Sequence, residues 1–371
     1  MKKYDLILKG ARVLDPSRNM DGAFDVAVKD GKISGLEKEI PAEEGEKVLD
    51  VSGYLLTPGL VDMHCHIYPR FPFEEDGLPT IQGEAHMFRS GVTACVDAGT
   101  CGGRDFLQFK ESVIDRSKLK IFAFVNIASG GMVNLESEQD IQEFQPEIAA
   151  AIAGTYDCVA GIKTAHYWVG RPVDSRHPAW ESVEQAVKAG ELCGKPVMAD
   201  FQPNLPWRTY PDLILKKLRP GDIHTHVYAI LDENRNMQEF MFRARDRGVI
   251  FDLGHGAGSF WFRNAVPALK QGFYPDTIST DLYLDNVNGP VIDLLHIMSK
   301  YLNMGMPIEE VIYRTTKRPA EIIGHRELGD LKIGREADIA LLDICRRGTR
   351  IHAGEQKTGV HYDNKSRGNR L

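Results

Sequence analysis

Two histidines that are separated by one residue, His64 and His66, close an apolar stretch that begins at Leu56. Side chains in a β-strand alternate between its two faces, so the two imidazoles would project one way and Met63 and Cys65 the other. Imidazole is the commonest metal ligand among side chains. Two buried histidines bonded to backbone carbonyls are the alternative, but this spacing at the end of an apolar strand favours a metal chelate.

The stretch that carries the histidine pair is typical of a strand that is buried on both faces. Leu60, Val61 and Met63 leave it without a regular polar face, as expected where other elements cover both sides of a sheet. Pro58 and Gly59 predict a turn at which this strand begins. The sequence therefore places the pair at the carboxyl end of a core strand.

Seven further apolar stretches follow, and helical patterns separate them. In the helical patterns at 180–193 and 237–247, apolar residues recur at spacings of three and four. The apolar stretches, including the first, are 56–66, 91–98, 120–127, 158–163, 196–200, 222–226, 249–255 and 277–281. Strands that alternate with helices predict an α/β fold of the (β/α)8 TIM-barrel type, in which the chemistry lies at the carboxyl ends of the strands.

Polar residues stand at or near all eight strand ends, where burial inside a core would be costly. In chain order they are His64 and His66, Asp97, Asn126, Lys163, Asp200, His226, His255 and Asp281. An aspartate at such a place is often the N-cap of the next helix, and His255 between two glycines is compatible with a loop residue. Their joint occurrence at the same end of eight strands indicates one shared site.

Both terminal segments are predicted to form β-structure around this barrel. Short strands are expected at 5–9, 24–29, 32–36 and 337–343. Asp30 and Gly31 between two of them are a strong hairpin signal. We expect a small β-sandwich from residues 1–55 and 326–371 and a barrel from 56–325, with no regular structure in the polar, Gly-rich end of the chain.

Bulk properties narrow the class of partner. The formal net charge is -7 and the two signs are mixed along the 371 residues, so no basic stripe for nucleic acid is present and a small-molecule substrate is expected. The six cysteines include no CxxC pair and are expected to be reduced thiols. No apolar run has transmembrane length and the first is too short for a signal peptide, which predicts a cytoplasmic protein without a membrane partner. Homo-oligomerisation stays open.

Motifs along the whole chain match one known family. They are Gly-Ala-Arg-Val-Leu-Asp at 10–15, Thr-Pro-Gly-Leu-Val-Asp-Met-His-Cys-His at 57–66, Gly-Val-Thr at 91–93 and Gly-Arg-Glu-Ala-Asp at 334–338. On these motifs the sequence resembles the amidohydrolase superfamily of metal-dependent hydrolases. The resemblance implies a distorted barrel with a β-sandwich formed by both termini, in agreement with the strand pattern.

A closer match within the superfamily is carried by shorter segments. These are 161–163, 219–222, 225–226, 254–256 and 259–260. They resemble the dihydroorotase-like branch, whose studied members behave as deacetylases of small acylated acids. The resemblance therefore implies cleavage of an ester or amide bond in a small, anionic acylated substrate.

The resemblance also implies a set of metal ligands for two divalent ions, zinc in first place and manganese or iron as alternatives. The implied ligands are His64, His66 and Asp281 for the more buried ion, His226 for the second, and a carboxylated Lys163 between them. A lysine that faces two cations cannot remain an ammonium, whereas its carbamate is an anionic oxygen ligand. His224 would share the face of His226, and the choice of His226 rests on the resemblance and on its place nearer the rim.

Two positions depart from the family pattern. Asp200 stands where a histidine is usual; it can still ligate, as a harder and negatively charged donor. The alternative is that Asp200 points away, capping a loop or binding Arg208. Dihydroorotases carry an arginine two residues beyond the histidine pair, where this chain has Tyr68, so dihydroorotase itself is set aside.

The expected mechanism is hydrolysis by a hydroxide that bridges the two ions, with Asp281 as the catalytic residue that accepts the proton and passes it to the leaving group. Candidate substrate-binding residues just past strand ends are His255, Tyr167, His166 and Arg171. The alternatives are a cyclic amidohydrolase of the dihydroorotase or hydantoinase type and a deaminase. A rival of another class is a non-catalytic barrel that serves as an interaction module.

Overall fold

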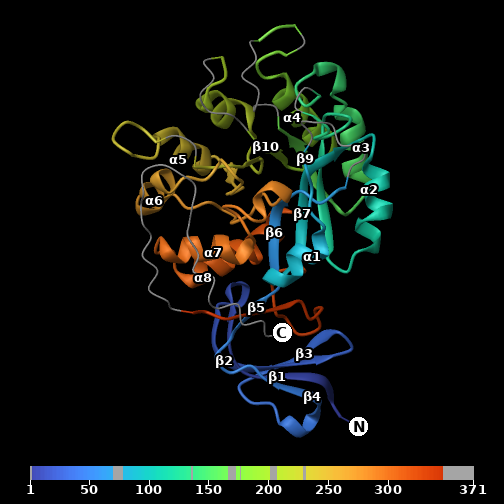
Figure 1. Ribbon diagram of the computed structural model, residues 1–371, viewed down its shortest axis with the longest axis vertical. Helices are drawn as coiled ribbons and strands as arrows, with labels where there is room; N and C mark the ends of the chain where they lie inside the picture. Colours follow the sequence, from blue (N-terminus) through green and yellow to red (C-terminus); the bar gives the residue numbers. More distant parts are fainter. Residues whose placement is uncertain are drawn as a thin grey trace.

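The structure is a computed structural model of the chain, and it describes residues 2–69, 78–134, 137–165, 173–175, 177–200, 207–228 and 231–345. Two sheets organise these residues. A six-stranded sheet lies at one end of the molecule, and a seven-stranded parallel sheet with its helices forms the larger part (Figure 1).

The parallel sheet follows the order of the chain. Its strands are β6 (Leu60–Cys65), β7 (Val92–Gly102), β8 (Lys120–Asn126), β9 (Val159–Thr164), β10 (Val197–Ala199), β11 (Ile223–His224) and β12 (Ile250–Phe251). Each strand pairs in parallel with the next one in sequence, from β6 at one edge to β12 at the other. The seven predicted apolar stretches from 56–66 to 249–255 therefore supply the sheet, except that residues 56–58 belong to β5 (Leu55–Pro58) of the six-stranded sheet.

The predicted eighth strand at 277–281 is not a strand in the described chain, and that prediction was wrong. The segment instead makes one isolated parallel bridge to each edge of the sheet, Thr277 with Asp252 and Leu282 with Cys65. Asp281 has a positive φ of 52°, which interrupts an extended backbone. The segment occupies the place between β12 and β6 that the eighth strand was expected to fill, but with irregular geometry.

The two faces of the parallel sheet carry different cores. One face packs against residues of α9 and just beyond it, and Val61 and Met63 belong to this core. The other face packs against the outer helices, and Cys65 belongs to that larger core. Met63 and Cys65 were expected on the same face; they part because the pairing of β6 with β7 shifts register between Asp62 and Cys65.

Nine α-helices of the described chain surround or extend the parallel sheet. They are α1 (Gly83–Met87), α2 (Phe106–Ser112), α3 (Pro146–Thr155), α4 (Glu181–Cys193), α5 (Glu239–Asp246), α6 (Phe262–Lys270), α7 (Leu294–Asn303), α8 (Ile308–Thr315) and α9 (Lys317–Ile322). Helices α4 and α5 confirm the two that the three-and-four spacing predicted. Among the described helices, none has the combination of length and apolar composition needed to pass through a bilayer.

The six-stranded sheet joins both ends of the described chain. It contains β1 (Tyr4–Asp15), β2 (Met20–Lys29), β3 (Lys32–Glu37), β4 (Gly45–Asp50), β5 (Leu55–Pro58) and β13 (Ile339–Leu342), in the order β13-β5-β1-β2-β3 with β4 paired to β1. The hairpin at Asp30–Gly31 is confirmed, and both residues have the positive φ of 50° and 69° that such a turn requires. The described residues form one sheet here, and the expected sandwich is not confirmed.

Charged contacts connect the two sheets. The Lys120 ammonium, at the start of β8, contacts the carboxylates of Glu336 and Asp338, which precede β13. The backbone N–H of Gly59 donates to the carbonyl of Asp338 at 2.9 Å. The Gly-Arg-Glu-Ala-Asp motif thus ties the terminal sheet to the amino-terminal end of the parallel sheet, away from the polar strand ends.

Candidate metal centre

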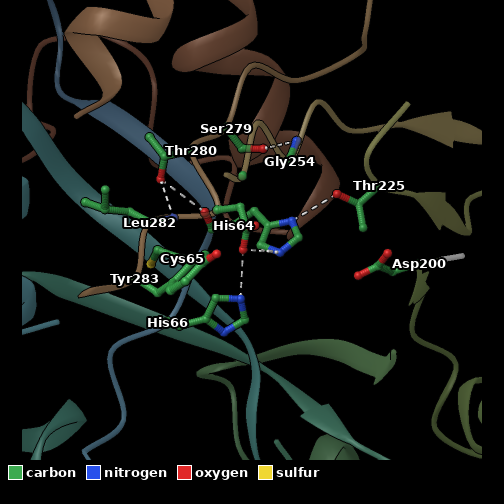
Figure 2. Close-up of polar contacts among 12 residues, drawn as sticks. His64, Cys65, His66, Asp200, Thr225, Gly254, Ser279, Thr280, Leu282 and Tyr283 are labelled. Carbon is green, nitrogen blue, oxygen red and sulfur yellow. Dashed lines mark hydrogen bonds and ion pairs between the residues drawn. The ribbon is translucent and has the colours of Figure 1, made fainter. Parts of the chain in front are cut away.

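Four of the predicted ligands converge near the carboxyl ends of the parallel strands. His66 Nε2 lies 3.0 Å and His64 Nε2 lies 3.4 Å from Asp281 Oδ1. One ligand atom each of His64, His226 and Asp281 lies within 4.8 Å of the others, and all three residues are buried. The rings of His64 and His66 meet edge to face with centroids 5.5 Å apart, and Figure 2 shows the His66 ring below that of His64. Nitrogen and oxygen donors gathered in this way fit a divalent transition metal.

The Nδ1 atoms of His64 and His66, which face away from Asp281, are hydrogen-bonded to neighbouring side chains. The Thr225 hydroxyl donates to Asp252 at 2.7 Å, so its oxygen accepts from His64 Nδ1 at 2.9 Å. Asp252 Oδ2 itself lies 3.2 Å from the same nitrogen. The Nδ1 of His66 lies 2.9 Å from the Thr100 hydroxyl. Both rings are therefore oriented with Nε2 toward the shared space, the arrangement seen in metal-ligating histidines.

His224 and His226 lie in different surroundings. His226 has a positive φ of 59°, which breaks the strand alternation, and its Nδ1 contacts the carbonyl of Gly254. His224 instead lies against the rings of Tyr210 and Phe251. Neither of its ring nitrogens has a hydrogen-bond partner among the described residues, and burial lowers its pKa to about 4. Of the two, only His226 lies in the ligand group.

Lys163 and Asp200 lie beside His226. The Lys163 side chain is 0 % exposed, and its Nζ lies 3.4 Å from Asp200 Oδ2. The same oxygen lies 3.3 Å from His226 Nε2. A Cβ on Gly99, which has a positive φ, would lie only 2.4 Å from Lys163 Cγ, so this glycine makes room for the lysine stem. Lys163 is therefore a buried lysine that faces Asp200, and not a surface residue.

Backbone hydrogen bonds around Asp281 fix the position of its carboxylate. Its backbone N–H donates to the carbonyl of His64 at 2.7 Å, and Asn286 donates to the carbonyl of Asp281 at 2.7 Å. Asn286 also accepts from the backbone N–H of Tyr283 at 3.0 Å. A non-glycine residue keeps a left-handed conformation only where its surroundings enforce it, which is common at functional sites.

Electrostatics keep His64 and Asp281 in the protonation states that bind metal. Burial lowers the pKa of His64, so the imidazole is neutral. Burial raises the pKa of Asp281, but its interactions with His64 and His66 outweigh this and hold the pKa below its ordinary value. A neutral imidazole and an ionised carboxylate are the forms that ligate. Burial lowers the pKa of His226, but the charge of Asp200 outweighs burial and raises it to about 9, so a metal would have to displace this proton.

Comparisons with known proteins agree with this geometry. No protein-family model matches the chain. The chain is 31% identical to a deacetylase of Brucella anthropi over 87% of this chain and 80% of that protein, and 30% identical to a deacetylase of Enterococcus faecalis over 92% and 90%. It is similar to the solved structures of an adenine deaminase (TM-score 0.79, 28% identity) and a dihydroorotase (TM-score 0.74, 27% identity), each over 91% of this chain and 89% of the other. The chain belongs to the amidohydrolase superfamily. It is a metal-dependent hydrolase.

Of the predicted substrate-binding residues of this amidohydrolase, the structure describes only His255. His166, Tyr167 and Arg171 lie outside the described residues. His255 is buried, and its ring stacks on Phe260 with centroids 4.4 Å apart. Its Nε2 lies 2.8 Å from the Nζ of Lys300.

Two other strand-end residues, Asp97 and Asn126, form hydrogen bonds to backbone groups next to the candidate metal centre. Asp97 accepts from the backbone N–H groups of Ile67 at 2.9 Å and Thr100 at 2.8 Å. Asn126 donates to the carbonyl of Gly99 at 3.2 Å. These contacts shape the segments that carry the histidine pair and cover Lys163.

Sequence reasoning missed two side chains of the amidohydrolase site. Asp252 lies inside the seventh apolar stretch, and a single carboxylate in an otherwise apolar strand could have indicated a functional role. Tyr283 follows Asp281 by two residues, and its ring lies 6.4 Å from that of His66. Burial and Asp281 raise the pKa of Tyr283 to about 12, so it carries its proton at neutral pH.

Proposed function

We propose that this amidohydrolase is a deacetylase-like enzyme that cleaves an ester or amide bond in a small, anionic acylated substrate. The observation that carries the proposal is the convergence of the histidine pair on Asp281. The similarity to two proteins named deacetylases, over most of the chain, supports it.

The proposed centre holds two divalent ions, zinc in first place and manganese or iron as alternatives. His64, His66 and Asp281 would hold one ion, and His226 with Asp200 the other. Lys163, carboxylated on Nζ, would lie between them. Divalent ions bound there supply Lewis-acid activation of a water molecule and of the scissile carbonyl.

Asp281 is the residue that we assign to proton transfer. Its Oδ1 faces the two histidines. Its Oδ2 lies on the side of Gly256, where an added Cβ would be only 2.6 Å away. We assign the proton taken from the attacking water to Oδ2, from which it passes to the leaving group.

Substrate contacts are proposed for residues around this carboxylate. The half-buried Tyr283 ring beside His66 offers a protonated hydroxyl to an anionic substrate. His255, His166, Tyr167 and Arg171 remain candidates for the same role.

A cyclic amidohydrolase or a deaminase is the second candidate, because the chain is similar to structures of a dihydroorotase and an adenine deaminase. One observation weighs against dihydroorotase itself. Tyr68, in place of the carboxylate-gripping arginine, is buried with its ring 4.8 Å from that of Phe109 in the outer core.

The test is a screen of N-acyl amino acids, O-acyl hydroxy acids and cyclic amides with zinc- and manganese-loaded protein. We expect turnover of an acylated acid that chelation abolishes and that Asp281→Asn lowers by a factor on the order of 100 or more. Asp21→Asn, in the terminal sheet, is the matched control and should keep full activity. Turnover of cyclic amides alone would support the second candidate, and near-zero bound metal without turnover would contradict the proposed metal centre.

A further inference from the structure

Residues 254–256, here called the glycine strap, run directly across the metal centre. A Cβ on Gly254 would lie 2.3 Å from Thr225 Oγ1 and 3.0 Å from both His226 Nδ1 and His64 Nδ1. The carbonyl of Gly254 contacts His226 Nδ1. Since this glycine has a positive φ of 45°, both its conformation and its close approach exclude a side chain.

The other end of the glycine strap touches the proton-transfer residue. A Cβ on Gly256 would lie 2.6 Å from Asp281 Oδ2, and this glycine also has a positive φ, of 57°. Its backbone N–H donates to the carbonyl of Thr280 at 3.0 Å. The strap therefore packs against His64, His226 and Asp281, and a displacement of the strap would change the space between all three.

His255 is the one residue of the strap with a side chain beyond Cα, and that side chain is tied to another element. Its ring stacks on Phe260, its Nδ1 lies 2.9 Å from the Gly256 carbonyl, and its Nε2 lies 2.8 Å from Lys300 Nζ. The Gly256 carbonyl can only accept, so Nδ1 donates to it and Nε2 is left to accept from Lys300 Nζ. The ring proton is then on Nδ1, where it is donated to Gly256.

Lys300 belongs to α7, and its burial is costly. It is 6 % exposed, and within the described chain no carboxylate lies within 4 Å of its Nζ. Its contacts are His255, the Pro290 carbonyl at 2.6 Å and the face of the Phe260 ring. Burial lowers its pKa to about 7. A methionine would fill the same volume without this cost, so packing alone does not explain a lysine here.

We propose that Lys300 is a positioning residue of the metal centre. By donating to His255 Nε2 it fixes the tautomer of His255 and the place of the glycine strap, and through the strap it sets the spacing of His64, His226 and Asp281. The inference rests on the metal centre proposed above. Lys300 touches no member of that centre, so its effect is indirect.

Three variants test the proposal. Lys300→Met removes the donor at similar length, and Lys300→Gln keeps an N–H donor. Lys195→Met is the control, because Lys195 is a half-buried lysine that also binds a backbone carbonyl, that of Val159, at the opposite end of the parallel sheet. The first measurement is zinc affinity by competition with a chelator. We expect Lys300→Met to lose about 10-fold or more, as for loss of a residue that orients metal ligands, Lys300→Gln to recover part of it, and Lys195→Met to match the wild type.

The second measurement reports the hydrogen bond between Lys300 and His255 directly, in metal-free protein. The ¹⁵N shifts of the His255 ring, assigned against His255→Gln, should report the Nδ1–H tautomer in the wild type and a mixture in Lys300→Met. An Nε2–H tautomer in the wild type would overturn the proposal even if Lys300→Met does not fold. Unchanged shifts and zinc affinity in a folded Lys300→Met would overturn it as well. These readings are independent of substrate turnover, so failure of the proposed activity stays distinguishable.

Discussion

The carboxylate of Asp252 lies 3.2 Å from Nδ1 of His64, and both side chains are buried. The other oxygen of this carboxylate accepts from the hydroxyls of Thr277 at 2.6 Å and Ser279 at 2.7 Å. Asp252 thus holds the irregular segment that stands in place of an eighth strand and, at the same time, orients a proposed metal ligand. Burial raises the pKa of Asp252, but hydrogen bonds from His64, Thr277 and Ser279 keep it below its ordinary value.

Asp252→Asn should weaken metal binding without unfolding the protein. An amide has the shape of the carboxylate but lacks the charge that favours the Nδ1–H tautomer of His64. We expect zinc affinity to fall by about 10- to 100-fold, measured by chelator competition. Asp21→Asn again serves as the control, and equal affinities of Asp252→Asn and the wild type would show that Thr225 alone orients His64.

Lys163→Ala should lose most of its activity and at least one bound ion, because the buried amine is the proposed site of the carbamate. Propionate, which supplies a carboxylate in the space left by the side chain, should restore part of the activity. Metal content by plasma mass spectrometry and turnover with and without propionate measure both effects. Full activity of the alanine variant in bicarbonate-free buffer would remove the carbamate from the mechanism.

Asp200→His should shift the rate profile to lower pH. An aspartate makes the ligand set more negative than a histidine does, so a bound water gives up its proton less readily in the wild type. We expect the acidic limb of kcat/KM to lie at higher pH in the wild type than in Asp200→His. The wild type should also keep more activity with manganese, since a carboxylate is the harder donor.

A different result would show that Asp200 is not a metal ligand. Identical profiles with both metals would mean that Asp200 does not ligate. A crystal structure of the zinc form would then place its carboxylate well beyond the coordinating distance of about 2.0 to 2.2 Å.

Asp25→Asn should destabilise the protein in a pH-dependent way. The buried Asp25 carboxylate binds Lys9 Nζ at 2.5 Å and the backbone N–H groups of Gly10 and Ile40, each at 2.8 Å. Burial raises its pKa, but these contacts outweigh burial and hold the pKa below its ordinary value. At pH 7 the variant should lose about 2 kcal/mol of unfolding free energy, as for hydrogen bonds to a charged group.

The sign of this pH dependence follows from the lowered pKa. The stabilisation by Asp25 is complete above the ordinary pKa of about 4 and is lost as the pH falls through the lower pKa of the folded state. Urea unfolding of metal-free protein should therefore show a difference between wild type and Asp25→Asn that shrinks below about pH 4. A difference that stays constant down to pH 3 would contradict the assignment.

The sequence by itself determined the features that depend on local pattern. Side-chain alternation predicted that His64 and His66 share one site, although the same rule failed for Met63 and Cys65. The three-and-four spacing marked α4 and α5, and Asp30–Gly31 marked the hairpin. The placement of Lys163 with the histidines also came from the sequence, because the carboxyl ends of parallel strands meet at one edge. Asp281 was predicted at the same site, although the strand that was expected to carry it did not form. Each of these follows from a backbone period or from a turn that a few adjacent residues specify.

Tertiary structure decided what depends on contacts between distant residues and on irregular backbone. The positive φ of His226 directs its imidazole into the site. The positive φ of Asp281 interrupts the expected eighth strand, and the segment there makes only isolated bridges to the two sheet edges. Asp252 and His64, which are 188 residues apart, meet only because the parallel sheet curls until the segment after β12 faces β6. A left-handed residue leaves no period in the sequence, and a hydrogen bond across the fold has no spacing to detect, so neither could be predicted from the chain alone.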